Sequence, residues 1–127
     1  MSVVLDASAL LAFLHDEPGG EAVSPALEGA RVSAVNWSEV LQKSLQRKVD
    51  IEGMQQEFIE VGVTFEPFTP QQAETAARLW SRTRNHGLSL ADRACLALAM
   101  DKALPVLTAD RVWADLDLDL EIQVVRL

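Results

Sequence analysis

The sequence has little of what marks several common classes of protein. It holds one cysteine, Cys95, so no internal disulfide can form, which suits a reducing compartment. No run approaches the roughly 20 apolar residues that a membrane-spanning helix needs, so no membrane partner is expected. No basic flank precedes the first apolar stretch, and Asp6 follows at once, which argues against a signal peptide. We therefore expect a cytoplasmic protein.

Positive charge and histidine are also scarce. There are 11 Lys and Arg residues against 19 Asp and Glu, a formal net charge of -8. This balance argues against nucleic-acid binding through a broad basic face, because phosphate contacts rely on clustered Lys and Arg. With two histidines and one cysteine, the chain also lacks the ligands of a typical zinc cluster. Any contact with nucleic acid must be local.

What the chain does have is enough apolar sequence for one core. At 127 residues and 49% hydrophobic, residues 1–127 are expected to form a single domain. Strand-like runs alternate with segments of helical periodicity. Strands are expected at 2–5, 31–35, 63–65, 105–108 and 122–125. Helices are expected at 7–14, from the turn at 17–20 to about 27, at 37–48, at 51–61, from 70 through 80, and at 89–102. Asn36 is expected to open the helix at 37, and Pro25 to kink or delay the second helix.

This alternation predicts an α/β fold with a central, mostly parallel sheet of four to five strands and helices on both faces. The helix at 89–102 is apolar nearly all round, so it should be central.

Four acids follow strands or lie in the first turns of the next helices: Asp6, Glu39, Asp92 and Asp110. Parallel strands end at one edge of the sheet, so the fold can gather these side chains there. Clustered carboxylates repel and raise one another's pKa unless a cation neutralises them. Oxygen-only ligands favour Mg²⁺ or Mn²⁺, and the sequence thus predicts a metal site formed by these four acids.

Each acid alone also has a structural explanation. Asp6 and Asp110 can each cap the helix that follows. Two pairs have the spacing of a capping box, Asn36 with Glu39 and Ser89 with Asp92. Capping does not predict that all four acids lie at helix starts facing one sheet edge.

Other charged residues lie near these acids in the sequence. Asp115 is close enough to Asp110 to support a metal through water. Four arginines could form a local patch that contacts RNA, although for any one of them an ordinary solvated helix residue is the more common explanation: Arg82, Arg84, Arg93 and Arg111.

Three phrases give a family resemblance: VVLDASAL at 3–10, LSLADRACLA at 88–97 and TAD at 108–110. With the four acids in this order, the chain resembles the PIN-domain nucleases, and among them the VapC-type toxins of toxin–antitoxin pairs. The resemblance covers residues 2–126. Pro25 and Ala91 depart from the family pattern without removing an acid.

The resemblance implies a metal-dependent endoribonuclease that hydrolyses RNA phosphodiester bonds with Mg²⁺ or Mn²⁺. It implies that Asp6, Glu39 and Asp92 are the main ligands and that Asp110 is a further ligand or orienting acid. Ser8 and Thr108 are expected to hydrogen-bond these carboxylates or the substrate. A cognate antitoxin and a homodimer are the implied protein partners.

Two other functions compete with this one. A catalytically silent PIN-like module would bind metal or RNA without cutting it. A phosphotransfer enzyme or receiver domain would also place acids beyond strands. Residues 6–8 lack the second aspartate of haloacid-dehalogenase phosphatases, and a receiver's strand-end lysine is missing.

Overall fold

The computed structural model describes residues 2–126, so the first and last residues of the expected domain lie outside it. Five strands form one sheet in the order β3-β2-β1-β4-β5, and every pairing is parallel. The strands are β1 Val4–Leu5, β2 Arg31–Ser33, β3 Thr64–Glu66, β4 Val106–Thr108 and β5 Ile122–Val124. The predicted α/β fold with a parallel sheet is confirmed.

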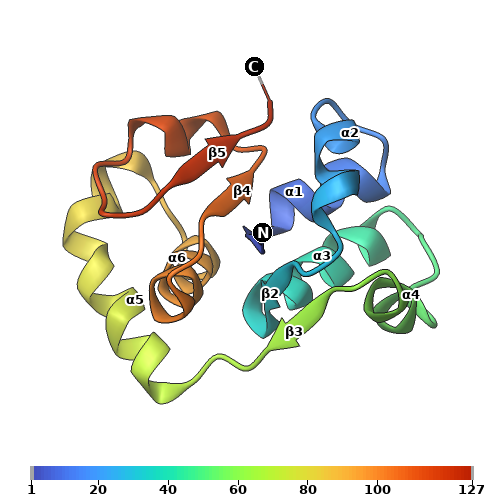
Figure 1. Cartoon of the computed structure of the whole chain (residues 1–127), viewed down its shortest axis with the longest axis horizontal. Coiled ribbons are helices and arrows are strands. Elements are labelled where there is room, and N and C mark those ends of the chain that lie inside the picture. Colours follow the sequence, from blue (N-terminus) through green and yellow to red (C-terminus); the bar gives the residue numbers. More distant parts are fainter. Residues whose placement is uncertain (1, 127) are drawn as a thin grey trace.

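The helices lie on both sides of the sheet, with α5 and α6 on one side and α1, α3 and α4 on the other (Figure 1). They are α1 Ala7–Leu14, α2 Gly20–Val23, α3 Ala34–Gln46, α4 Met54–Glu60, α5 Pro70–Thr83 and α6 Leu90–Lys102, with 3₁₀ turns η1 Ser24–Ala26, η2 Arg84–His86 and η3 Arg111–Asp115. Within residues 2–126, no helix is long and apolar enough to cross a bilayer.

Successive side chains of each strand point to opposite faces of the sheet, and this creates two apolar layers. Val4 and Val106 pack into the cluster that contains Leu96 and Leu98 of α6. Leu5, on the opposite face, packs into the cluster that α1, α3 and α4 complete. The α6 helix is buried along most of its length, as its apolar sequence predicted, because it lies between the sheet and α5.

The start of α3 differs from the expectation. The helix begins at Ala34, and Ser33 is its N-cap, its hydroxyl accepting from the Val35 backbone N–H at 3.3 Å. Asn36 therefore does not open the helix. Its side chain is fully buried, and its Nδ2 donates to the Ala91 carbonyl at 3.0 Å. The proposed capping box of Asn36 and Glu39 is wrong because both residues lie inside the helix.

The second helix is shorter than expected. It ends at Val23, and the chain continues as η1, with Pro25 in the first turn, where its missing N–H costs little. The α2 helix packs tightly against the end of α1: a Cβ at Gly20 would lie 2.4 Å from the Ala12 carbonyl oxygen, so only glycine fits.

The strand order creates the crevice that positions the site. From β1 the chain moves to β2 and β3 on one side, and later to β4 and β5 on the other. The direction in which successive strands are added to the sheet thus reverses between β1 and β4, although the two strands are parallel. Open parallel sheets bind ligands at such a point, beyond the carboxyl ends of their strands.

Candidate active site

Asp6 lies at this reversal point. It follows β1, is 3% exposed and caps α1, its Oδ1 accepting from the Ala9 backbone N–H at 2.9 Å. The capping role considered for Asp6 is therefore real. This hydrogen bond uses Oδ1, and Oδ2 is left to other partners.

Two hydroxyls, those of Ser8 and Thr108, bind the Asp6 carboxylate. Ser8 Oγ is within 2.8 Å of Oδ1 and 2.9 Å of Oδ2, and Thr108 Oγ1 donates to Oδ2 at 2.6 Å. In turn, the Ala109 and Asp110 backbone N–H groups donate to Ser8 and Thr108 at 2.9 and 3.1 Å. This network joins the start of α1 to the end of β4, so it fixes Asp6 across the crevice.

Burial dominates the electrostatics of Asp6. It raises the pKa of the carboxyl from 3.8 to about 6, against the opposing effect of the hydrogen bonds from Thr108, Ala9 and Ser8. The negative charge of Asp92 raises it further. Asp6 is therefore a carboxylate that a nearby cation would stabilise.

Glu39 and Asp92 come from two helices that pack against each other, α3 and α6. Burial raises the pKa of Glu39, Lys43 lowers it, and the charge of Asp92 raises it again. Asp92 forms the expected capping box with Ser89: its Oδ2 accepts from the Ser89 N–H at 2.9 Å, and its own N–H donates to Ser89 Oγ at 3.2 Å.

Three of the acids affect the buried Cys95 thiol through their charges. Burial raises the pKa of this thiol well above the usual range, and the charges of Asp6, Asp92 and Glu39 raise it further. The fold thus brings these three carboxylates, which we call the acid site, close enough for their charges to interact.

Asp110 lies at the margin of the acid site. It caps η3, its Oδ1 accepting from the Val112 N–H at 3.0 Å. Its backbone N–H donates to the Thr108 hydroxyl, which in turn donates to Asp6. Asp115 is exposed at the other end of η3.

The donor atoms of the acid site suit a divalent cation better than their placement does. Its donors are carboxylate oxygens, which suit hard ions such as Mg²⁺ and Mn²⁺, and a cation would relieve the burial of Asp6. Among residues 2–126, however, no three Asp, Glu, His or Cys side chains converge into a metal-holding group. The Asp92 carboxylate accepts from the N-cap of its own helix, and the Asp6 carboxylate accepts from Thr108.

The four arginines expected to contact RNA are divided. Arg82 Nη2 donates to the Asp117 carbonyl at 2.6 Å, and Arg84 lies 5.1 Å from the centroid of the Trp80 ring. Arg93 Nη1 donates to the Ala76 carbonyl at 2.8 Å and so links α6 to α5. Of the four, only Arg111 lines the pocket beside the acid site.

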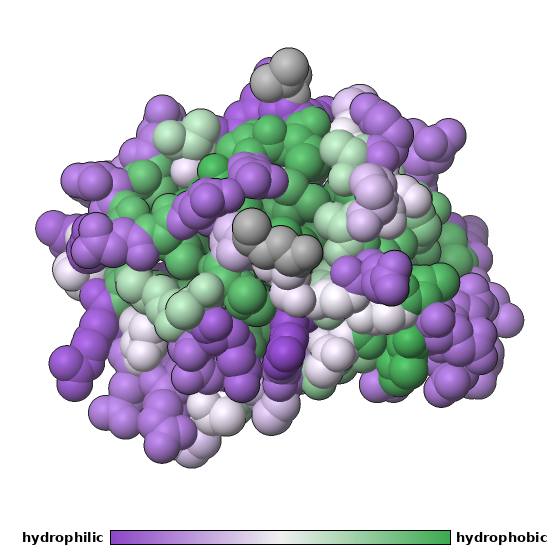
Figure 2. Space-filling model, in the orientation of Figure 1, coloured by the Kyte–Doolittle hydropathy of each residue, from purple (hydrophilic) through white to green (hydrophobic). Residues whose placement is uncertain are grey.

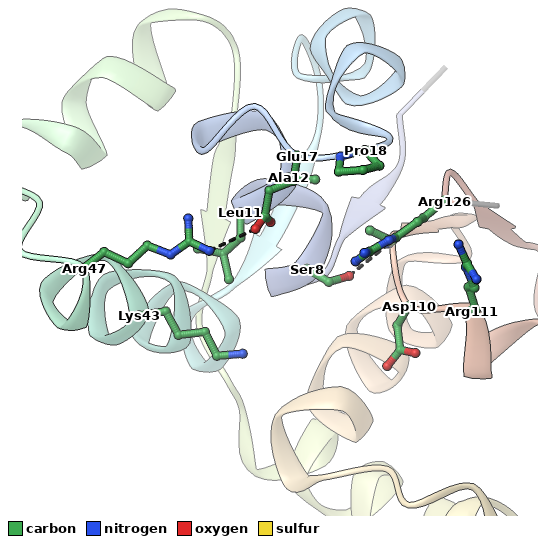
Figure 3. Close-up of a pocket in the computed structure, with 11 residues that line it drawn as sticks. Ser8, Leu11, Ala12, Glu17, Pro18, Lys43, Arg47, Asp110, Arg111 and Arg126 are labelled. Atoms are coloured by element: carbon green, nitrogen blue, oxygen red, sulfur yellow. Dashed lines mark hydrogen bonds and ion pairs between the residues drawn. The ribbon is translucent and has the colours of Figure 1, made fainter.

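This pocket has a volume of about 550 Å³ and opens where α1, α3 and the segment after β4 meet (Figure 3). Ser8 and Asp110 line it, and so do three basic residues that had not been expected there: Lys43, Arg47 and Arg126. The position of Lys43, four residues after Glu39 on one helix face, is a signal that the sequence contains. Nothing in the sequence joins Arg126 to the site.

No curated protein sequence matches the chain significantly. Among solved structures, a toxin–antitoxin complex from Klebsiella pneumoniae has a TM-score of 0.74 at 16% identity, covering 97% of both chains. FitAcB from Neisseria gonorrhoeae has a TM-score of 0.72 at 21% identity, covering 98% of both.

A third similar structure is VapC20 from Mycobacterium tuberculosis, described as a sarcin-ricin loop cleaving toxin. It has a TM-score of 0.69 at 13% identity, covering 94% of this chain and 98% of its own. The TM-scores of these three structures establish a likeness of fold. The sequence itself matches the PIN domain family over residues 3–118, most of its length, and the chain belongs to that family.

Proposed function

We propose that the protein is a metal-dependent endoribonuclease that hydrolyses RNA phosphodiester bonds and acts as the toxin of a toxin–antitoxin pair. The observation that carries the proposal is the acid site: three carboxylates from separate elements whose charges all act on the buried Cys95 thiol. Membership of the PIN family supports it, and so does fold likeness to toxins, one of which is described as a sarcin-ricin loop cleaving toxin.

In the proposed mechanism, Asp6, Glu39 and Asp92 hold one or two Mg²⁺ or Mn²⁺ ions, and Asp110 is a further ligand or orienting acid. Such an ion, when bound, lowers the pKa of water and neutralises charge that develops on phosphate oxygens. The Ser8 and Thr108 hydroxyls keep the Asp6 carboxylate oriented while it binds. No catalytic His or Lys is needed for this chemistry.

The proposed partner is an antitoxin that covers the acid site, and a homodimer is proposed as well. Fold likeness to a chain of a toxin–antitoxin complex supports the first. For the second, large apolar side chains are exposed, including Leu45 at 55%, Trp80 at 52% and Leu90 at 55%, and Figure 2 shows apolar areas between the polar side chains of one face. Light scattering of the purified protein measures the oligomeric state.

The test of the proposed function is cleavage by the purified protein. The wild type with Mg²⁺ or Mn²⁺ should cut RNA internally, and EDTA should stop it. Asp6→Asn and Asp92→Asn should each lose at least about a hundredfold of the rate, while Asp50→Asn, a change of one exposed carboxylate, should keep it. Wild-type rates in the two site variants would refute the assigned roles.

A silent PIN-like module that binds metal or RNA is the second candidate. The observation that favours it is the lack of a preformed metal-holding group within residues 2–126. RNA binding without any new RNA ends, under the conditions that support metal binding, would select this function over the first.

A further inference from the structure

The pocket beside the acid site reverses the sign of charge found over the rest of the chain. Its lining includes four of the 11 Lys and Arg residues, against two acids, Glu17 and Asp110. The basic ones are Lys43, Arg47, Arg111 and Arg126. In a protein of formal net charge -8, such a concentration attracts an anion to this place rather than to the surface in general.

The basic side chains reach the pocket from separate parts of the fold. Lys43 comes from α3 and Arg126 from the segment after β5, and they extend into the pocket from opposite sides (Figure 3). Leu11, Ala12 and Pro18 add an apolar portion to the lining. An elongated anion with apolar parts between its charges matches this mixture.

The pocket is continuous with the acid site. Ser8, which binds the Asp6 carboxylate, lines the pocket too, and Lys43 is close enough to Glu39 to lower its pKa. A polymer whose reacting group lies at the acids can therefore place its neighbouring groups against the basic side chains.

We propose that this pocket binds the RNA strand on one side of the scissile phosphodiester, with Lys43 and Arg126 contacting backbone phosphate oxygens. The proposal rests on the endoribonuclease function proposed above. Backbone contacts of this kind position a strand and carry little sequence information, so they fit a protein with few basic residues. The volume of about 550 Å³ is within the usual range of ligand pockets.

One acid in the pocket opposes this binding. Glu17 forms an ion pair with Arg47, Oε2 to Nη2 at 2.9 Å, and both side chains are partly exposed. The pair neutralises Arg47 and places a carboxylate where phosphate would approach. Removing the Glu17 charge should consequently tighten RNA binding, whereas a purely structural pocket gives no reason for a gain.

The experiment measures binding of a short fluorescein-labelled single-stranded RNA by anisotropy, with Mg²⁺ present, at several NaCl concentrations. All proteins carry Asp6→Asn to prevent cleavage. The test variants are Lys43→Gln, Arg126→Gln and Glu17→Gln. Their matched controls are Lys102→Gln and Arg78→Gln, exposed basic residues outside the pocket, and thermal unfolding verifies the fold of each protein.

Lys43→Gln and Arg126→Gln should each weaken binding several-fold and flatten the slope of log K against log[salt] by about 0.7, the value for one phosphate contact to a single strand. Glu17→Gln should tighten binding, and the controls should change neither quantity. If the Lys43 and Arg126 variants match their controls, the pocket does not hold RNA.

The two proposals fail separately. If the pocket variants bind RNA as their controls do, while Asp6→Asn still loses cleavage, the pocket proposal is wrong and the nuclease proposal stands. If the pocket variants bind RNA more weakly than their controls, but the protein that retains Asp6 does not cleave RNA, the pocket proposal is supported and the nuclease proposal is refuted.

Discussion

Asp6 shows how one residue combines a structural and a chemical role. Its carboxylate accepts hydrogen bonds from the Ala9 N–H and the Ser8 and Thr108 hydroxyls, all of which favour the charged form. Burial nevertheless raises its pKa to about 6. The desolvation of the charge therefore outweighs the three hydrogen bonds. At neutral pH the folded protein contains a carboxylate that is destabilised by its burial.

This imbalance predicts a pH-dependent stability. Because the folded pKa of Asp6 lies above its unfolded value of 3.8, its contribution is fully present below about pH 4 and is lost as pH rises through 6. The shift of about two units corresponds to roughly 3 kcal/mol at pH 7. Without divalent ions, Asp6→Asn should raise the free energy of unfolding at pH 7 by about 1–3 kcal/mol, and by much less at pH 4.

Urea denaturation in EDTA across this pH range measures the effect. The control is Asp50→Asn, because Asp50 is exposed and its Oδ1 accepts only a local hydrogen bond from the Glu52 N–H at 3.0 Å. An Asp6→Asn protein less stable than the wild type at pH 7 would mean that the hydrogen bonds to the carboxylate matter more than its burial.

Asn36 is a second residue whose place explains the site. Its Nδ2 donates to the Ala91 carbonyl at 3.0 Å, and its side chain also hydrogen-bonds the Glu39 carboxylate, which lowers the pKa of Glu39. One buried amide thus joins α3 to α6 immediately before Asp92. It links the two helices that carry Glu39 and Asp92.

Asn36→Ala should cost about 1–3 kcal/mol of stability, because the Ala91 carbonyl loses its buried donor. It should also weaken Mg²⁺ binding measured by calorimetry, since Glu39 and Asp92 are no longer held together. Asn85→Ala, an exposed change in η2, is the matched control. Unaltered metal affinity in a destabilised Asn36→Ala protein would restrict Asn36 to a role in packing.

At the scale of elements, the start of α6 must serve two requirements at once. Ser89 and Asp92 satisfy the free N–H groups of its first turn through a capping box, and the Asp92 charge contributes to the acid site. A negative charge at a helix N-terminus is also favoured by the helix dipole. The sequence pattern alone supports either role, so substitutions are needed to separate them.

Two substitutions divide these roles. Ser89→Ala removes the cap and keeps the charge, so it should cost about 0.5–2 kcal/mol of stability and leave most of the RNA cleavage. Asp92→Asn keeps an oxygen that can accept from the Ser89 N–H, so it should retain stability and lose cleavage. Thermal unfolding and cleavage are measured on the same samples. Equal loss of cleavage in both variants would show that the cap itself controls the site.

At the scale of the whole molecule, the excess of negative charge makes cation binding a source of stability. The formal net charge is -8, and three of the acids interact around Cys95. Ions that bind only the folded state stabilise it by mass action. Mg²⁺ at about a hundred times its dissociation constant should add roughly 2.7 kcal/mol.

Thermal unfolding with increasing Mg²⁺ or Mn²⁺ should thus show a rising midpoint for the wild type and a much smaller rise for Asp6→Asn. Na⁺ at the same ionic strength is the control for general screening of charge. A midpoint that rises equally in both proteins would attribute the effect to the surface charge and not to the acid site.

Much of the fold was predictable from the sequence because local rules decide it. Alternation of strands and helices required a parallel sheet, and the apolar composition of α6 required burial. Asp6 and Glu39 follow β1 and β2, which end at one edge of the sheet, so the sequence predicted that they meet. Asp92 does not follow a strand: α6 comes after α5 and η2, and its packing against α3 brings Asp92 near Glu39. The start of α3 was misplaced, because Ser33 caps the helix and a long-range hydrogen bond uses Asn36.

By itself the sequence determined the family and the order of elements, because these depend on residue type and spacing along the chain. Only the tertiary structure decided which basic residues stand beside the acids. Lys43 and Arg126 are separated by most of the chain, and Arg82, Arg84 and Arg93 are held elsewhere by contacts to other residues. Side chains meet through packing, and that packing depends on every element at once.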